Sequence, residues 1–209
     1  MGTIKNGRHH GKVGKTVTYM LNGKLVTRSI GKSDKPATDL QKAIRLRTKV
    51  TSKFLLTLKE FILVGYEADA RRIKQHPINQ AFRYHWKHAS TGNYPKIKID
   101  FPKVLLSYGS MPLPKKVVIS VVEKGFNFSW GSQKGLTGTH WSDQVMLVAY
   151  FPTLKRAAYK TAGATRDQGT DLLPIFDILH GVVAETYIAF ISNDRKTISN
   201  SVYTGRVTW

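Results

Sequence analysis

A β-hairpin about Asn22-Gly23 is the feature that most constrains the fold of this 209-residue chain. Both central residues of a type I′ turn need φ > 0, a conformation that asparagine and glycine adopt more readily than other residues. Folding the segment 16–30 about this turn places Tyr19 opposite Val26. A two-stranded ribbon alone is marginally stable in water, so the hairpin must pack on another surface or join a larger sheet.

Both faces of the predicted hairpin carry apolar side chains. Burying one face against the same chain leaves the other exposed, together with two unpaired strand edges that are templates for another chain. We therefore expect self-assembly by strand addition, with completion of the hairpin inside its own chain as the alternative. The residues expected in the assembly contact are Val17, Tyr19, Leu21 and Val26 on one face and Met20 and Leu25 on the other.

The net charge of +20 predicts a polyanionic partner, because it is large and unevenly placed. Residues 1–116 hold 24 Lys and Arg against 6 Asp and Glu, a net charge of +18. Residues 117–209 hold 9 against 7, a net charge of +2. The N-terminal half is therefore where we expect nucleic acid, or another polyanion, to bind.

Two groups of cations in that half are candidate phosphate contacts. One group lies in a Gly-rich arm, and the other follows one stripe of a helix predicted over residues 38–64. That helix begins with the capping box Thr38-Asp39-Leu40-Gln41 and stops at Gly65. No Glu stands four residues from the stripe cations, so we expect them to be unpaired within the helix. The candidate nucleic-acid-binding residues are Arg8, Lys12 and Lys15 in the arm and Lys42, Arg45, Lys49 and Lys53 on the helix.

The pattern changes from helices to strands along the chain, which predicts an α+β fold. A second helix is expected at residues 77–89 and a strand at 96–108. Short strands separated by turn residues then follow to the C-terminus, which is typical of a mainly antiparallel β-sandwich. We therefore predict a basic N-terminal region over 1–111 and a sandwich domain over 112–209.

The C-terminal half resembles the fibronectin type III pattern. Phe128-Ser129-Trp130 supplies a core Trp on the second strand, and the segments 187–192 and 199–201 supply a Tyr-containing strand followed by Ser-x-Ser. Gly181 stands where that pattern usually has Leu. The resemblance implies a fibronectin type III-like sandwich and implies no particular activity.

The whole chain also resembles an uncharacterised bacterial family of unknown function. The segments that carry this resemblance are Gly11–Gly14, Gly23–Ser29, Thr38–Arg47, Arg166–Gly169 and Tyr187–Gly205. The resemblance supports the fold and its boundaries.

The sequence predicts neither catalysis nor a metal or cofactor site. Cysteine is absent, and none of the 13 carboxylates forms an acid/base pair within a motif. The G-x-S-x-G, H-E-x-x-H and dinucleotide-binding motifs are also absent. The histidine pairs His9-His10 and His85/His88 lack a third ligand nearby, so we expect no metal there.

The expected function is that of a non-enzymatic structural protein that binds nucleic acid non-specifically and self-assembles, in a filament or virion-type assembly. The alternative is an adhesion-type sandwich module that binds acidic glycans or a protein partner. No apolar h-region of a signal peptide and no stretch of about 20 apolar residues is found, so no membrane span is expected. The expected location is the cytoplasm, or a virion-like or released assembly.

Overall fold

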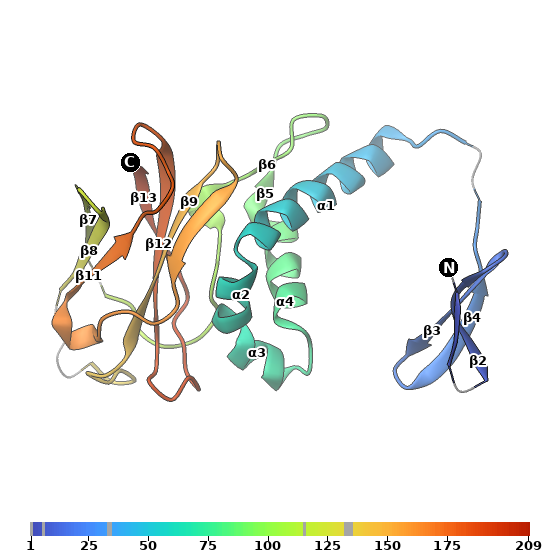
Figure 1. Cartoon of the computed structure of the whole chain (residues 1–209), viewed down its shortest axis with the longest axis horizontal. Helices are drawn as coiled ribbons and strands as arrows, with labels where there is room; N and C mark the ends of the chain where they lie inside the picture. Colours follow the sequence, from blue (N-terminus) through green and yellow to red (C-terminus); the bar gives the residue numbers. More distant parts are fainter. Residues whose placement is uncertain (1, 6, 33–34, 115, 132–135) are drawn as a thin grey trace. The chain divides into compact units, whose positions relative to one another are not determined.

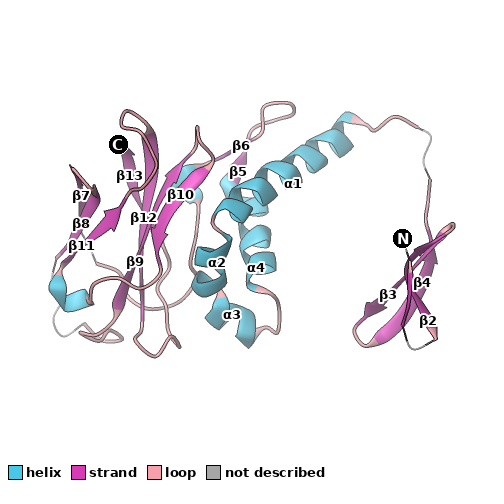
Figure 2. Cartoon of the chain, in the orientation of Figure 1, coloured by secondary structure: helices cyan, strands magenta, loops and turns pink. Residues whose placement is uncertain are grey.

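The computed structural model describes residues 2–5, 7–32, 35–114, 116–131 and 136–209, and the chain forms two compact units. Unit 1 is Met1–Thr38 and unit 2 is Asp39–Trp209. The division therefore lies at residues 38/39, whereas the sequence suggested one at 111/112. The fold is α+β, as predicted (Figures 1 and 2).

Unit 1 is a four-stranded antiparallel sheet whose strands follow in chain order. Its strands are β1 (Thr3–Lys5), β2 (Arg8–Val13), β3 (Thr16–Leu21) and β4 (Lys24–Ser29). The predicted hairpin is confirmed, with Tyr19 opposite Val26 and positive φ at Asn22 and Gly23. The Gly-rich arm is itself a strand, β2, which pairs with β3 and covers one edge of the hairpin from within the same chain.

The described residues of this sheet form almost no buried core of their own. Thr18 is the only described residue of strands β1–β4 that is buried, at 5% exposure, and its hydroxyl lies 2.9 Å from that of Thr27 across the sheet. Exposed large apolar side chains occur on both faces of the hairpin, among them Tyr19 and Met20. Units of about 40 residues or fewer usually need disulfides, metals or oligomerisation to stay folded.

Unit 2 begins with helices, the first of which is shorter than predicted. They are α1 (Asp39–Thr57), α2 (Lys59–Gly65), α3 (Glu67–Arg72) and α4 (Pro77–Tyr84), the last continuing into the π-helical turn η1 (His85–Ala89). The predicted helix 38–64 breaks at Leu58, which leaves the helical region at φ −112° and ψ 19°. The predicted helix 77–89 is present as α4 and η1, and Pro77 occupies its first turn as expected.

The predicted strand 96–108 was wrong. Only the short β6 (Lys98–Ile99), paired with β5 (Ser90–Thr91), and the 3-10 helix η2 (Phe101–Lys103) form there. Pro102 explains the difference, because proline has no N–H for a strand ladder and fixes φ near the helical value.

The rest of unit 2 is the predicted sandwich of two antiparallel sheets. The four-stranded sheet has the order β10-β9-β12-β13 and the three-stranded sheet the order β11-β8-β7. The strands are β7 (Val117–Val122), β8 (Gly125–Trp130), β9 (Gln144–Phe151), β10 (Arg156–Lys160), β11 (Thr170–Pro174), β12 (Val183–Ile191) and β13 (Val202–Thr208), with the 3-10 helix η3 (Arg166–Gln168) before β11.

The helices and the sandwich share strands β9 and β12, which are buried on both faces. On one face Met146 and Tyr187 pack with Phe54 and Phe61 of the helices. On the other face alternate residues such as Phe190 pack with the inner side of the three-stranded sheet. Unit 2 is therefore a three-layer structure, with helices, a central sheet and an outer sheet (Figure 1). This shared core explains why no division occurs at 111/112.

Candidate nucleic-acid interface

Unit 1 presents exposed cations beside an aromatic ring. It holds eight Lys and Arg against one Asp, a net charge of +7. Lys12 stands opposite Val17, which stands opposite Arg28, so these two cations flank one rung of the sheet. The guanidinium of Arg28 also lies 6.0 Å from the ring centroid of Tyr19. Cations interleaved with an aromatic ring suit a phosphate backbone and its bases.

The other two predicted residues of unit 1 lie outside this rung. Lys15 is exposed in the turn between β2 and β3. Arg8 is in β2, and its side chain lies outside the described part of the chain. His9 and His10, adjacent in the same strand, stand opposite Ile4 and Thr3 of β1.

The helical stripe is present on α1, with one exception to its predicted unpaired state. Arg45, Lys49 and Lys53 are exposed and have no ion-pair partner among the described residues. Lys42, in contrast, forms an exposed ion pair with Asp39 at 3.0 Å. Such pairs contribute about 0.2–1 kcal/mol, so a phosphate can replace the carboxylate at small cost. The four cations extend over about 17 Å of helix axis, close to five nucleotide steps of one B-form strand.

The predicted apolar face of the helix is buried only in its second half. Phe54 and Leu58 are buried, whereas Leu40 is 72% exposed and Ile44 is also exposed. Arg47, which the periodicity places on this face, lies 5.4 Å from the ring centroid of Trp86 in η1. This cation–π contact joins α1 to η1 and leaves the stripe on the exposed side.

The buried charges of the sandwich are paired within it. Asp143 and Arg166 form a buried ion pair at 3.3 Å, and Glu185 accepts hydrogen bonds from Tyr203 at 2.6 Å and from Arg206 at 2.7 Å. Burial lowers the pKa of Arg166, and the neighbouring Asp143 opposes that shift. Sequence reasoning missed both networks, because their members lie 18 or more residues apart.

The two histidines near α4 have separate environments. The Nδ1 atom of buried His85 donates to the carbonyl of Ala81 at 2.6 Å, and its Nε2 atom accepts from the Leu105 N–H at 3.3 Å. Burial lowers the pKa of His85 to about 4. His88 is exposed, with its ring 5.0 Å from that of Tyr84. No group of three potential metal ligands occurs among the described residues, and none of the described helices is long and apolar enough to cross a membrane.

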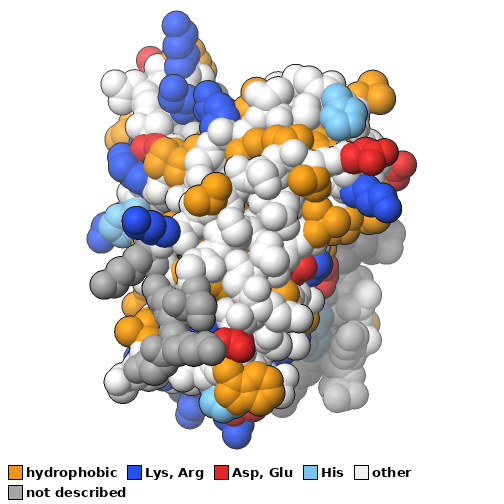
Figure 3. Space-filling model, turned by 90° about the vertical axis from the view of Figure 1, so that its left-hand side faces the viewer, with side chains coloured by type: hydrophobic (Ala, Val, Ile, Leu, Met, Phe, Trp, Pro, Cys, Tyr) orange, Lys and Arg blue, Asp and Glu red, His pale blue; other side chains and the backbone are white. Residues whose placement is uncertain are grey.

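The outer face of the three-stranded sheet differs from the rest of this basic protein, because its outward strand positions carry no charge. Ser129 of β8 stands between Val118 and Thr170, and Asn127 stands between Ser120 and Leu172. Figure 3 views this side and shows Lys and Arg side chains mainly around its margin. Among the described residues, a polyanion therefore has no cation to contact at the outward strand positions of this face.

The comparison with protein families identifies a family that covers most of the chain. A family of unknown function (DUF6266) matches residues 5–205, which span both units. The chain belongs to this family. No curated protein and no solved structure matches it. The DUF6266 match thus agrees with the resemblance of the whole chain to an uncharacterised family.

Proposed function

We propose that the protein is a non-enzymatic structural protein that binds nucleic acid without sequence preference and assembles with copies of itself. Its place would be the cytoplasm or a virion-like or released assembly. The observation that carries nucleic-acid binding is the exposed, unpaired set of Arg45, Lys49 and Lys53 on α1. Phosphate contacts by such cations release counterions, which provides affinity without base recognition.

The shape of the cation sets supports non-specific binding. A stripe about 17 Å long on a rigid helix follows a backbone of regularly spaced charges. The helix offers Lys and Arg but no amide side chain beyond Gln41 for base edges. Backbone contacts fix position on nucleic acid and carry no sequence information directly.

The observation that supports self-assembly is the absence of a buried core among the described strands of unit 1. The second supporting feature is the free outer edge of β4, since β3 is its only partner in the described sheet. The Ile30 N–H points toward β3, because it donates to the Lys15 carbonyl at 2.7 Å. Along an antiparallel strand, successive N–H groups point alternately toward the partner strand and away from it. The N–H groups of Leu25, Thr27 and Ser29 therefore face away from β3, where the carbonyl groups of a strand from a second copy can accept hydrogen bonds from them.

A protein partner remains the second candidate, favoured by one observation. The outer face of β7, β8 and β11 carries uncharged side chains, including the exposed Val118. This face suits a protein surface better than it suits acidic glycans, because no cation stands at its outward strand positions.

The test uses the full chain and two variants of equal net charge. Replacing Arg45, Lys49 and Lys53 with Gln lowers the net charge from +20 to +17, and so does replacing the exposed Lys116, Lys124 and Lys155. The first variant should lose affinity for a 20-base-pair duplex and reduce the salt slope by about 3, and the second should keep both. Equal losses in the two variants would mean that net charge, and not this stripe, controls binding. Absence of wild-type binding at 50 mM salt would refute the proposal.

Assembly is tested on the same protein by size-exclusion chromatography with light scattering, with and without nuclease. We expect a multimer that survives nuclease treatment. A monomer at high micromolar concentration and low salt, with and without added nucleic acid, would remove the assembly half of the proposal.

A further inference from the structure

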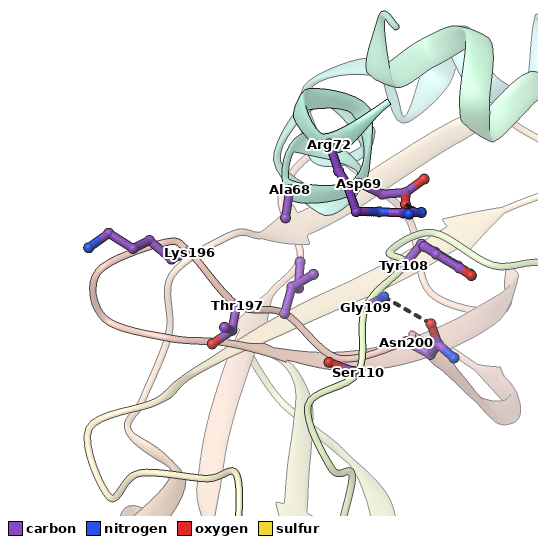
Figure 4. Close-up of a pocket in the computed structure, with 10 residues that line it drawn as sticks. Ala68, Asp69, Arg72, Tyr108, Gly109, Ser110, Lys196, Thr197 and Asn200 are labelled. Atoms are coloured by element: carbon purple, nitrogen blue, oxygen red, sulfur yellow. Dashed lines mark hydrogen bonds and ion pairs between the residues drawn. The ribbon is translucent and has the colours of Figure 1, made fainter. Parts of the chain in front are cut away.

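Two hollows in unit 2 meet at one aromatic side chain, Tyr108. The first has a volume of about 380 Å³ and lies against α3, α4 and η1. The second has a volume of about 330 Å³ and lies against the turn between β12 and β13 (Figure 4). Both hollows are lined by Asp69, Arg72 and Tyr108, so these residues form the wall between them.

Tyr108 is held in place from both sides. Its N–H donates to the carbonyl of Gly65 at 2.9 Å, and the next residue, Gly109, donates its N–H to Asn200 Oδ1 at 3.0 Å. Glycine is needed at both neighbouring positions, since a Cβ at Gly65 would collide with the Leu106 carbonyl and one at Gly109 with the Ile198 carbonyl. The backbone that carries Tyr108 is therefore fixed without any ligand.

The ring of Tyr108 lies nearly parallel to the ring of the buried Tyr66, and Tyr108 itself is 43% exposed. Its plane makes an angle of 16° with that of Tyr66, with centroids 6.4 Å apart. Tyr66 is fixed in turn by its hydroxyl, which donates to the Leu105 carbonyl at 2.8 Å, and burial raises the pKa of that hydroxyl. Tyr84 and His88 add further rings to the first hollow. Flat, fixed aromatic rings of this kind are platforms for an unstacked base.

The hollows are also strongly cationic. Asp69 is the only carboxylate among the described residues that line either of them, and it is paired with Arg72 at 2.6 Å. Arg83 and Lys87 stand four residues apart on α4 and η1 and have no ion-pair partner in the described part of the chain. A ligand here meets aromatic rings and free positive charge together.

We infer that these two hollows bind single-stranded nucleic acid, with a base on Tyr108 and the adjacent phosphate on Arg83 and Lys87. Only a single strand, or a frayed end, can place the flat face of a base on a ring inside a hollow, because the bases of a duplex are stacked on one another. The inference rests on the proposed function and deepens it, since it adds a preference for single strands that the α1 stripe alone does not provide.

The experiment measures the affinity of the full chain for a labelled 20-nucleotide single strand and for a 20-base-pair duplex. Wild type should favour the single strand. Replacing Tyr108 with Ala should weaken single-strand binding about 5- to 150-fold, leave duplex binding unchanged and leave the salt slope unchanged. Tyr94→Ala is the matched control, because Tyr94 is also 43% exposed and lies outside both hollows.

A second variant tests the phosphate contacts. Replacing Arg83 and Lys87 with Gln should reduce the single-strand salt slope by about 1.4, as expected for two lost contacts. A single strand carrying 2-aminopurine should lose fluorescence on binding to wild type and recover it with Tyr108→Ala, because stacking quenches that base.

The outcomes separate this inference from the proposed function. If wild type binds single strand and duplex equally and Tyr108→Ala changes neither, the hollows are not a base-binding site and the proposed function stands. If Tyr108→Ala weakens both equally, the single-strand preference is refuted as well. If wild type binds neither probe at 50 mM salt, both proposals fall together.

Discussion

Arg166 and Asp143 form an ion pair whose side chains are only 4% and 2% exposed. The Nε atom of Arg166 lies 3.3 Å from Asp143 Oδ2, and its guanidinium carbon lies 4.1 Å from the ring centroid of Phe190. A second donor of the guanidinium reaches the Pro112 carbonyl at 3.0 Å. One side chain thus connects η3, the β8–β9 segment and the segment that precedes β7.

Breaking this pair should destabilise unit 2 strongly. Arg166→Leu leaves the Asp143 carboxylate buried without a counter-charge, which we expect to cost about 3–5 kcal/mol in free energy of unfolding. The double variant Arg166→Leu with Asp143→Leu should recover part of that loss, because neither charge of this pair then remains buried. Urea unfolding of both variants measures this, and a double variant less stable than Arg166→Leu alone would contradict it.

The contact between Arg47 and Trp86 should stabilise the joint between α1 and η1. We expect Arg47→Ala to lower the free energy of unfolding by about 1 kcal/mol, and the melting temperature by about 2–4 °C. Arg45→Ala is the control, because Arg45 is exposed on the same helix without a partner and should change stability by less than about 0.5 kcal/mol. Equal shifts in the two variants would show that the cation–π contact contributes nothing.

The burial of His85 should make stability depend on pH between about 4 and 6.5. The unfolded histidine has a pKa near 6.5, and burial lowers the folded pKa to about 4. The unfolded state therefore binds more protons in this window, so stability is complete above about pH 6.5 and falls as the pH drops toward 4. The loss across the window should approach roughly 3 kcal/mol.

His85→Gln should flatten this dependence while lowering stability at pH 7, because the Leu105 N–H and the Ala81 carbonyl lose a well-placed partner. His88→Gln serves as the control, since His88 is exposed and its removal should leave the slope unchanged. Chemical unfolding at several pH values gives the measurement, and an unchanged slope in His85→Gln would show that other groups cause it.

The parts of the fold that depend on local chemistry were predictable from sequence. The turn at Asn22-Gly23 fixed the register of β3 and β4 because its residues favour φ > 0, and the alternating pattern indicated the sandwich. The break at Leu58 was not predictable, since no Gly or Pro marks it. The strand predicted over 96–108 forms only at Lys98–Ile99, because Pro102 lacks an N–H for the ladder despite the alternation of Ile97, Ile99 and Phe101.

Contacts between residues that lie far apart in the sequence could not be predicted from local patterns. The stripe on α1 and the ion pair of Lys42 with Asp39, three residues away, are by contrast local, because helical spacing brings both sets of side chains together. The two hollows at Tyr108 combine α3, α4 and the turn before β13. Tyr108 and Asn200, which both line the second hollow, come from distant parts of the chain. No pattern within either segment indicates that they meet.

The outer edge of β4 gives the sharpest test of assembly. The N–H of Thr27 faces away from β3, whereas that of Val26 faces toward it. This follows because N–H directions alternate along the strand and the Ile30 N–H points toward β3, where it donates to the Lys15 carbonyl. Thr27→Pro should therefore block strand addition at this edge while keeping every backbone hydrogen bond between β3 and β4. We expect it to convert a multimeric wild type into a folded monomer by light scattering. Thr27→Val removes the same hydroxyl but keeps the N–H, so it should stay multimeric. If Thr27→Pro also stays multimeric, the copies do not join through the edge of β4.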